Sequence, residues 1–303
     1  REKGIAVEEL CQYSYDTNRN QTDIKNTKTG EDQTYVYDAE NRLSQVSMTK
    51  DGKTAVIQQN IYNGEGQRIQ KVDGDETTNY YYQNGVVAYT TDANGEQNSQ
   101  NLIGTDGNVL ATERFQQNAT QYYLYNKDIQ ESTSSLVKED GSADATYRYT
   151  DFGETTINGD NKVENEVCYT GGIYDQSTGL YYLNARYYNP EDGRFVTEDT
   201  YRGETNEPDT QNLYVYCADN PVNYVDPSGH WIDTVLDVAS LGYSIKEFMS
   251  NPSWSKFGYL LWDVGATFIP FVPGSYSRKG AKITLKIADK VHELNKGKKG
   301  LTI

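Results

Sequence analysis

Residues 171–196 read GGIYDQSTGLYYLNARYYNPEDGRFV, and this stretch decides the fold that we expect. Four of its five tyrosines form the pairs Tyr181-Tyr182 and Tyr187-Tyr188, and polar turn residues lie after each pair. A series of further turns continues from here to the tetrapeptide DPSG at 226–229. Aromatic residues favour β-strands, whereas Gly, Asn, Asp and Pro favour turns. The stretch therefore predicts short strands joined by tight turns.

A degenerate repeat becomes visible upstream when strand-like segments are aligned on their tyrosines. Tyr15, Tyr37 and Tyr62 each precede a turn rich in Asp, Asn or Gly, and they lie 22 and 25 residues apart. Each unit reads as a strand, a turn and a second strand, which is the pattern of a hairpin. A period of this length indicates a repeat architecture. Because single hairpins are marginal in water, we expect them to stack side by side into a spiral.

The composition supports an all-β body and separates the end of the chain from the rest. There are 27 Tyr and 26 Gly but only 7 Phe and 7 Pro, and the net charge is −16. The last 73 residues hold 10 basic and 6 acidic side chains, which leaves about −20 on the first 230. Phosphate binding needs a basic face, so the acidic body argues against nucleic acid as a partner. The change near residue 230 marks a domain boundary.

Apolar residues of the tail recur at helical spacing, as at Ile232, Val235, Leu236 and Ala239. We therefore expect a small α-helical segment there. No run of 18 apolar residues occurs, so we expect no membrane-spanning helix. Three cysteines at no metal-ligand spacing and two histidines predict neither a metal site nor a cofactor. The chain begins at Arg1 without a signal peptide, and we expect it to be a C-terminal piece of a longer polypeptide.

Several short elements in fixed order together resemble the core segment that closes the β-shell of RHS-repeat, or YD-repeat, proteins. The matching pieces are GLYY at 179–182, ARYYNP at 185–190, GRF at 193–195, NLYVY at 212–216, NPV at 220–222 and DPSG at 226–229. The resemblance implies a mainly β fold, in which antiparallel hairpins form a spiral shell wall and a small helical segment follows.

Three parts are implied by this resemblance. Residues 1–165 would form the repeat wall, and residues 166–230 the repeat-associated core that acts as a plug. Residues 231–303 resemble a pre-toxin linker, through WDVG at 262–265 and PGSY at 273–276, with the effector itself absent or truncated.

The resemblance also implies self-cleavage just after His230, by the mechanism of an aspartic protease. We therefore expect the chain to be at most a protease that cuts itself, with no multi-turnover activity. Two carboxylates that share one proton activate a water and protonate the scissile carbonyl. The candidate catalytic residues are Arg194, Asp199 and Asp209, and the candidate cleavage motif is Asp226, Pro227, Ser228, Gly229 and His230.

This chain departs from the family pattern at three places near these motifs. Residues 197–200 read TEDT where the family usually has Ser-Pro-Asp-Pro, His230 stands where it usually has Leu, and Glu131 stands where it usually has Gly. The alternative for Asp199 and Asp209 is structural, since both would then cap turns or pair with nearby arginines. Asp226 would likewise shape a turn.

Three functions follow for the whole chain. The first is an encapsulating shell fragment of a bacterial RHS-type polymorphic toxin, secreted or at the cell surface, with its own C-terminal effector region and an immunity protein as partners. The second is an adhesion or carbohydrate-binding module that contacts cell-wall or cell-surface glycans. The third is a small effector toxin in residues 231–303.

Overall fold

The computed structural model describes residues 11–27, 29–104, 107–116, 119–159, 165–203, 211–230 and 233–234. Three antiparallel sheets of fourteen, four and two strands hold these residues together. The strands of the largest sheet are β1 (Cys11–Tyr15), β2 (Gln21–Asn26), β3 (Asp32–Tyr37), β4 (Leu43–Lys50), β5 (Lys53–Tyr62), β6 (Arg68–Asp73), β7 (Glu76–Gln83), β8 (Val86–Thr91), β9 (Gln97–Ile103), β10 (Val109–Gln116), β11 (Ala119–Lys127), β12 (Thr133–Lys138), β13 (Ala143–Tyr149) and β14 (Thr155–Gly159). The four-stranded sheet consists of β15 (Ile173–Asp175), β16 (Leu180–Leu183), β17 (Arg186–Asn189) and β18 (Arg194–Phe195). The smallest pairs β19 (Tyr224–Val225) with β20 (Asp233–Thr234), and two 3-10 turns, η1 (Tyr169–Gly171) and η3 (Cys217–Asp219), lie between.

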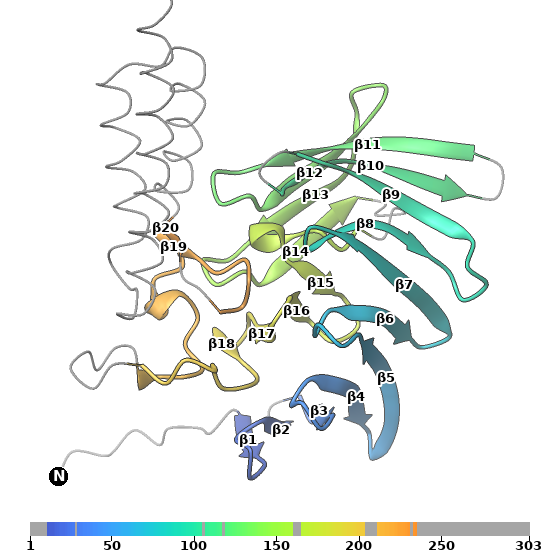
Figure 1. Ribbon diagram of the computed structural model, residues 1–303. Helices are drawn as coiled ribbons and strands as arrows, with labels where there is room; N and C mark the ends of the chain where they lie inside the picture. The colour runs from blue at the N-terminus through green and yellow to red at the C-terminus, as the bar shows by residue number, and fades with distance from the viewer. Residues whose placement is uncertain are drawn as a thin grey trace, which may run out of the picture.

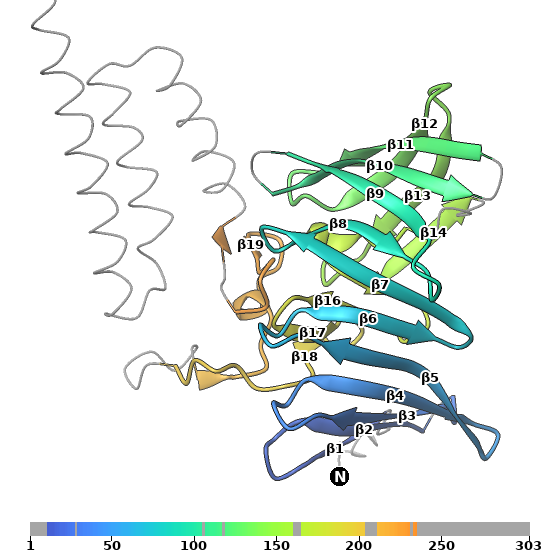
Figure 2. The ribbon, with the colours of Figure 1, turned by 45° about the vertical axis from the view of Figure 1, so that its right-hand side comes forward.

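The fourteen strands, which we call the wall, pair strictly in sequence order from β1 to β14. Figures 1 and 2 show them stepping from blue β1 at the bottom to green β11 and β12 at the top, around the yellow strands β15–β18. We call β15–β18 the inner sheet. The expected mainly β architecture of stacked antiparallel hairpins is thus confirmed. The expected helical tail lies outside the described residues, apart from Asp233–Thr234 in β20.

The Asp and Asn residues of the repeat close the wall's five-residue turns. In five of these turns the first residue is Asp or Asn, and its side chain accepts the backbone N–H of the fifth residue at 2.8–2.9 Å, as Asp38 does from Arg42. The fourth residue takes a positive φ, which is 61° at Asn41 and 64° at Glu131. The first residues of these turns are Asp16, Asp38, Asn63, Asp92 and Asp128. The glycine that is missing at Glu131 therefore does not prevent the turn, although the left-handed conformation is strained there.

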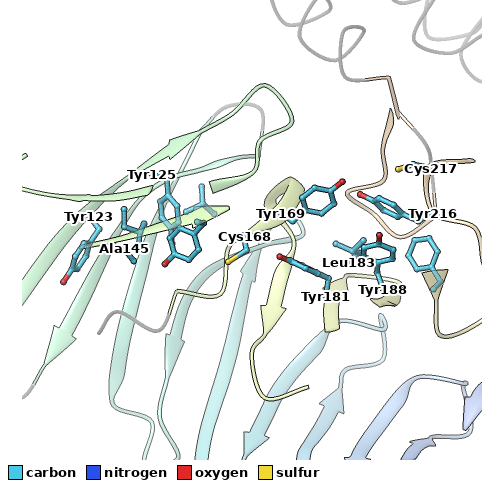
Figure 3. Close-up of a cluster of buried hydrophobic side chains, with 14 residues drawn as sticks. Tyr123, Tyr125, Ala145, Cys168, Tyr169, Tyr181, Leu183, Tyr188, Tyr216 and Cys217 are labelled. Carbon is cyan, nitrogen blue, oxygen red and sulfur yellow. The ribbon is translucent and has the colours of Figure 1, made fainter. Parts of the chain in front are cut away.

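The inner sheet is buried on both faces, because the wall wraps around it. All eight residues of β16 and β17 are buried. Side chains alternate across a strand, so Tyr181 and Leu183 pack with one group of wall residues, and Leu180 and Tyr182 with the other. The first group comes from β10–β13 and includes Tyr123, Tyr125, Leu136 and Ala145; the second comes from β3 and β4 and includes Tyr35, Leu43 and Val46. Figure 3 shows Tyr181 and Tyr188 of the inner sheet beside Tyr169 and Tyr216.

A buried ion cluster also joins the wall to the inner sheet. Arg68 and Lys71 on β6 contact Asp175, the last residue of β15. Lys71 also contacts Glu166, which accepts the Tyr80 hydroxyl at 3.0 Å. The two positive and two negative charges balance, which is the condition for burying them together.

Candidate self-cleavage site

The DPSG turn lies against the connection between β16 and β17. The Ala185 N–H donates to the Ser228 carbonyl at 3.2 Å, and the Arg186 Nε donates to the Gly229 carbonyl. Gly229 has a φ of 72°, and a Cβ there would lie 2.6 Å from the Leu183 carbonyl oxygen. Both the backbone conformation and the close approach therefore require glycine at this position.

The buried guanidinium of Arg186 contacts two carboxylates. Its Nη2 atom lies 2.8 Å from Asp199 Oδ2 and 3.5 Å from Asp226 Oδ2, and its carbon lies 3.5 Å from the centre of the Phe195 ring. Burial lowers the pKa of Arg186, and the two carboxylates oppose that shift. The site therefore brings two acids from distant parts of the chain within reach of one nitrogen.

His230 lies between these two acids. Its backbone N–H donates to Asp226 Oδ1 at 3.1 Å, and its Nδ1 lies 3.9 Å from Asp199 Oδ1. Burial raises the pKa of Asp199, but the His230 contact, the charge of Arg186 and the Tyr201 N–H outweigh it, so the pKa is lowered. His230, directly after the DPSG turn, is thus hydrogen-bonded to Asp226 through its backbone and faces Asp199 with its side chain.

The structure brings some of the candidate residues together and separates one. Asp199, Asp226 and His230 share the site, whereas Arg194 is exposed on β18, where its charge acts on Asp192. Asp209 lies outside the described residues. Asp199 also accepts the Tyr201 N–H at 2.9 Å, which is the turn-capping contact of the structural alternative.

Sequence reasoning missed Arg186, although it lies within the ARYYNP motif. One feature of the sequence could have identified it: Arg186 lies beside tyrosines in a predicted strand where polar and apolar residues do not alternate. Such a strand is buried on both faces, and a buried arginine needs carboxylate partners. Among the described residues, no group of three His, Cys, Asp or Glu side chains is placed to hold a metal ion. No described helix is long and apolar enough to cross a membrane.

Comparison with known proteins places the fold in a family. The family model Teneurin YD-shell matches residues 58–222. The tRNA3(Ser)-specific nuclease WapA of Bacillus spizizenii is 33% identical over 234 residues, and the tRNA nuclease WapA of Bacillus subtilis is 32% identical over 234. Each of these matches covers 76% of this chain and 10% of the relative. The chain thus spans about a tenth of the length of these relatives.

Solved structures agree on the fold. The complex TcdB2-TccC3-Cdc42 has a TM-score of 0.52 at 19% identity, covering 76% of this chain and 14% of that chain. The complex TcdB2-TccC3 without its hypervariable C-terminal region has a TM-score of 0.51 at 20% identity, covering 72% and 13%. The matched fold and repeats define a β-shell protein of the RHS, or YD-repeat, class. This chain belongs to the Teneurin YD-shell family.

Proposed function

We propose that this chain is a section of the encapsulating shell of a secreted or surface-associated polymorphic toxin. Relatives with toxin or nuclease names support the proposal, and so does the packing of wall residues against both faces of the inner sheet. Residues 1–165 would be wall, 166–230 the core and 231–303 a linker toward the protein's own C-terminal effector. An immunity protein for that effector would be a further partner. An effector within 231–303 itself would lie almost entirely outside the described residues.

The core segment would cut its own chain after His230. One of Asp199 and Asp226 would be ionised and take a proton from water, while the other donates its proton to the His230 carbonyl oxygen. The resulting tetrahedral carbon breaks its bond to the Trp231 nitrogen, which receives a proton. The products are a carboxylate on His230 and a new amino terminus at Trp231. Arg186 would hold the acids and the Gly229 carbonyl in place.

One observation carries this proposal. The same guanidinium contacts both acids and the carbonyl of Gly229, the residue directly before His230. A turn formed only for shape would need neither a second acid nor a buried arginine beside it. If Asp226 only shaped a turn, the arrangement of Asp199 and Gly229 around Arg186 would therefore have no explanation.

Intact mass spectrometry of the purified chain tests the cleavage. We expect fragments that end at His230 and begin at Trp231, and we expect Asp199→Asn and Asp226→Asn to remain intact. Asp209→Asn tests the remaining acid of the sequence prediction in the same assay. Arg194→Ala is the control, because its side chain is exposed and should leave cleavage unchanged. An intact wild-type chain over days at pH 5 to 8 would contradict the proposal.

A row of aromatic and polar side chains on the outer face of the wall favours glycan binding as a second function. The residues Tyr81, Tyr89, Gln100, Glu113 and Tyr122 pair in register across β7–β11. The Tyr81 and Tyr89 rings stack at 4.3 Å, and both are exposed, as is Tyr122. Ring faces pack against sugar C–H groups, whereas Gln and Glu bind hydroxyls. Tyr89 and Tyr122 are three strands, or about 14 Å, apart, and the acidic body favours a neutral glycan.

Affinity electrophoresis in neutral polysaccharides tests this second function. Retardation of the wild type should be lost in Tyr81→Ala/Tyr89→Ala. Ile61→Ala removes a similarly exposed side chain from β5 and should leave the retardation unchanged. Equal mobility of all three proteins with and without polysaccharide would overturn it.

A further inference from the structure

His230 is placed to control the charge of the two acids. Its imidazole faces Asp199, its backbone N–H is bound by Asp226, and its side chain is 37% exposed. Imidazole is the side chain whose charge most readily changes within the physiological pH range. The leucine that related chains usually carry at this position has no such proton.

The charges around His230 come from three elements of the structure. Arg186 faces the site from β17, Asp199 from the loop after β18, and Asp226 from the turn after β19. When Asp199 and Asp226 share one proton, they carry a single negative charge together, which the positive charge of Arg186 balances. A protonated His230 adds a positive charge that compensates the second carboxylate. It therefore favours loss of the shared proton, on which the cleavage chemistry depends.

We infer that His230 is a positioning residue whose protonation suppresses self-cleavage, so that this chain cuts itself more slowly in acid than a chain with leucine there. This inference rests on the proposed self-cleavage. The imidazole would act through Asp199 and would not touch the attacking water. The chain would then be processed at neutral pH and preserved in a more acidic compartment.

Cleavage rates of three variants test the inference at pH 5.5 and 7.5. We expect the ratio of the His230→Leu rate to the wild-type rate to rise about tenfold as the pH falls, which corresponds to one pKa unit of coupling. His230→Gln keeps a polar side chain without the charge and should behave like His230→Leu. His230→Lys keeps a positive charge at both pH values and should be slow at both. A ratio that is the same at both pH values would overturn the inference while leaving the cleavage proposal intact.

A titration that needs no cleavage separates the two ideas. The imidazole pKa of His230 is measured by NMR in the full chain with Asp226→Asn, and again with Asp199→Asn added. His292→Gln removes the other histidine, so that one signal remains. We expect the pKa to fall when Asp199 is neutralised, because the ionised carboxylate favours the imidazolium. An unchanged pKa would overturn the inference whether or not any chain cleaves.

Discussion

Arg68 Nη1 lies 2.5 Å from Asp175 Oδ2, and neither side chain is exposed to solvent. This contact joins β6 of the wall to β15 of the inner sheet. Arg68 also lies over the rings of Tyr80 and Tyr182, at 4.9 and 4.8 Å. The inner sheet is thus held by charge as well as by packing. A shift of the sheet against the wall would leave these buried charges without their partners.

Removing one member of this pair should destabilise the whole chain. Asp175→Ala leaves a buried guanidinium without its main partner, which costs about 3–5 kcal/mol. The free energy of unfolding in urea measures the loss. Arg19→Ala is the control, because Arg19 also pairs with an acid from the core segment, Glu198, but its own side chain is 65% exposed. We expect less than about 1 kcal/mol there, and equal effects of the two substitutions would refute the buried role.

The same pair should make stability fall in acid. Burial raises the pKa of Asp175, but Arg68, Lys71 and Gln58 outweigh it and hold the pKa below its ordinary value. A lowered pKa contributes stability above the unfolded value of about 4, and this is lost as the pH falls through the folded value. Urea unfolding between pH 7 and 2.5 should therefore show a steeper loss for the wild type than for Arg68→Met/Asp175→Leu. Parallel curves would contradict this assignment.

Glu131→Gly should stabilise the chain. Glu131 takes a φ of 64°, which is strained for a side chain with a Cβ, and its contact with Lys127 is long, at 3.6 Å. We expect a gain of about 0.5–1 kcal/mol in the free energy of unfolding. Gly95→Ala makes the reverse change at the matching position of another turn, where a Cβ would meet no atom within 4 Å. It should lose a similar amount, and a loss from both substitutions would show that φ is not the controlling factor.

Gly229→Ala should abolish self-cleavage without unfolding the chain. The added Cβ would meet the Leu183 carbonyl at 2.6 Å and the Arg186 nitrogen at 3.0 Å, so the turn must move away from the acids. Gly179→Ala carries the same backbone strain, at a φ of 75°, but meets no atom within 4 Å. Mass spectrometry should find only Gly229→Ala uncut, whereas cleavage of both would show that the fit of the turn is unimportant.

The wall could be predicted from the sequence because its signals are local. Tyrosine spacing and the Asp or Asn of each turn define a hairpin within about ten residues, as at Tyr37 and Asp38. Contacts across the structure could not be predicted in this way. Arg19 and Arg68 lie in or directly after repeat turns and both pair with acids of the core segment, yet one is exposed and the other is fully buried against Asp175. The choice depends on where the inner sheet lies, which no local pattern encodes.

The candidate site was predictable only in part for the same reason. The DPSG motif located Asp226 and His230, because turn chemistry is written in four consecutive residues. The arginine beside Asp199 was predicted to be Arg194, which is nearer in sequence, whereas Arg186 is the one in contact. A strand that is paired on both sides brings such distant residues together, and sequence distance does not measure that.

Hydrogen exchange of the inner sheet tests most directly whether the wall encloses it as one cooperative structure. The backbone amides of β16 and β17 should exchange only with global unfolding, as slowly as those of β4 and β5, and Asp175→Ala should speed all four strands together. Exchange in β16 and β17 while β4 and β5 stay protected would contradict this account, since the inner sheet would then open independently of the wall.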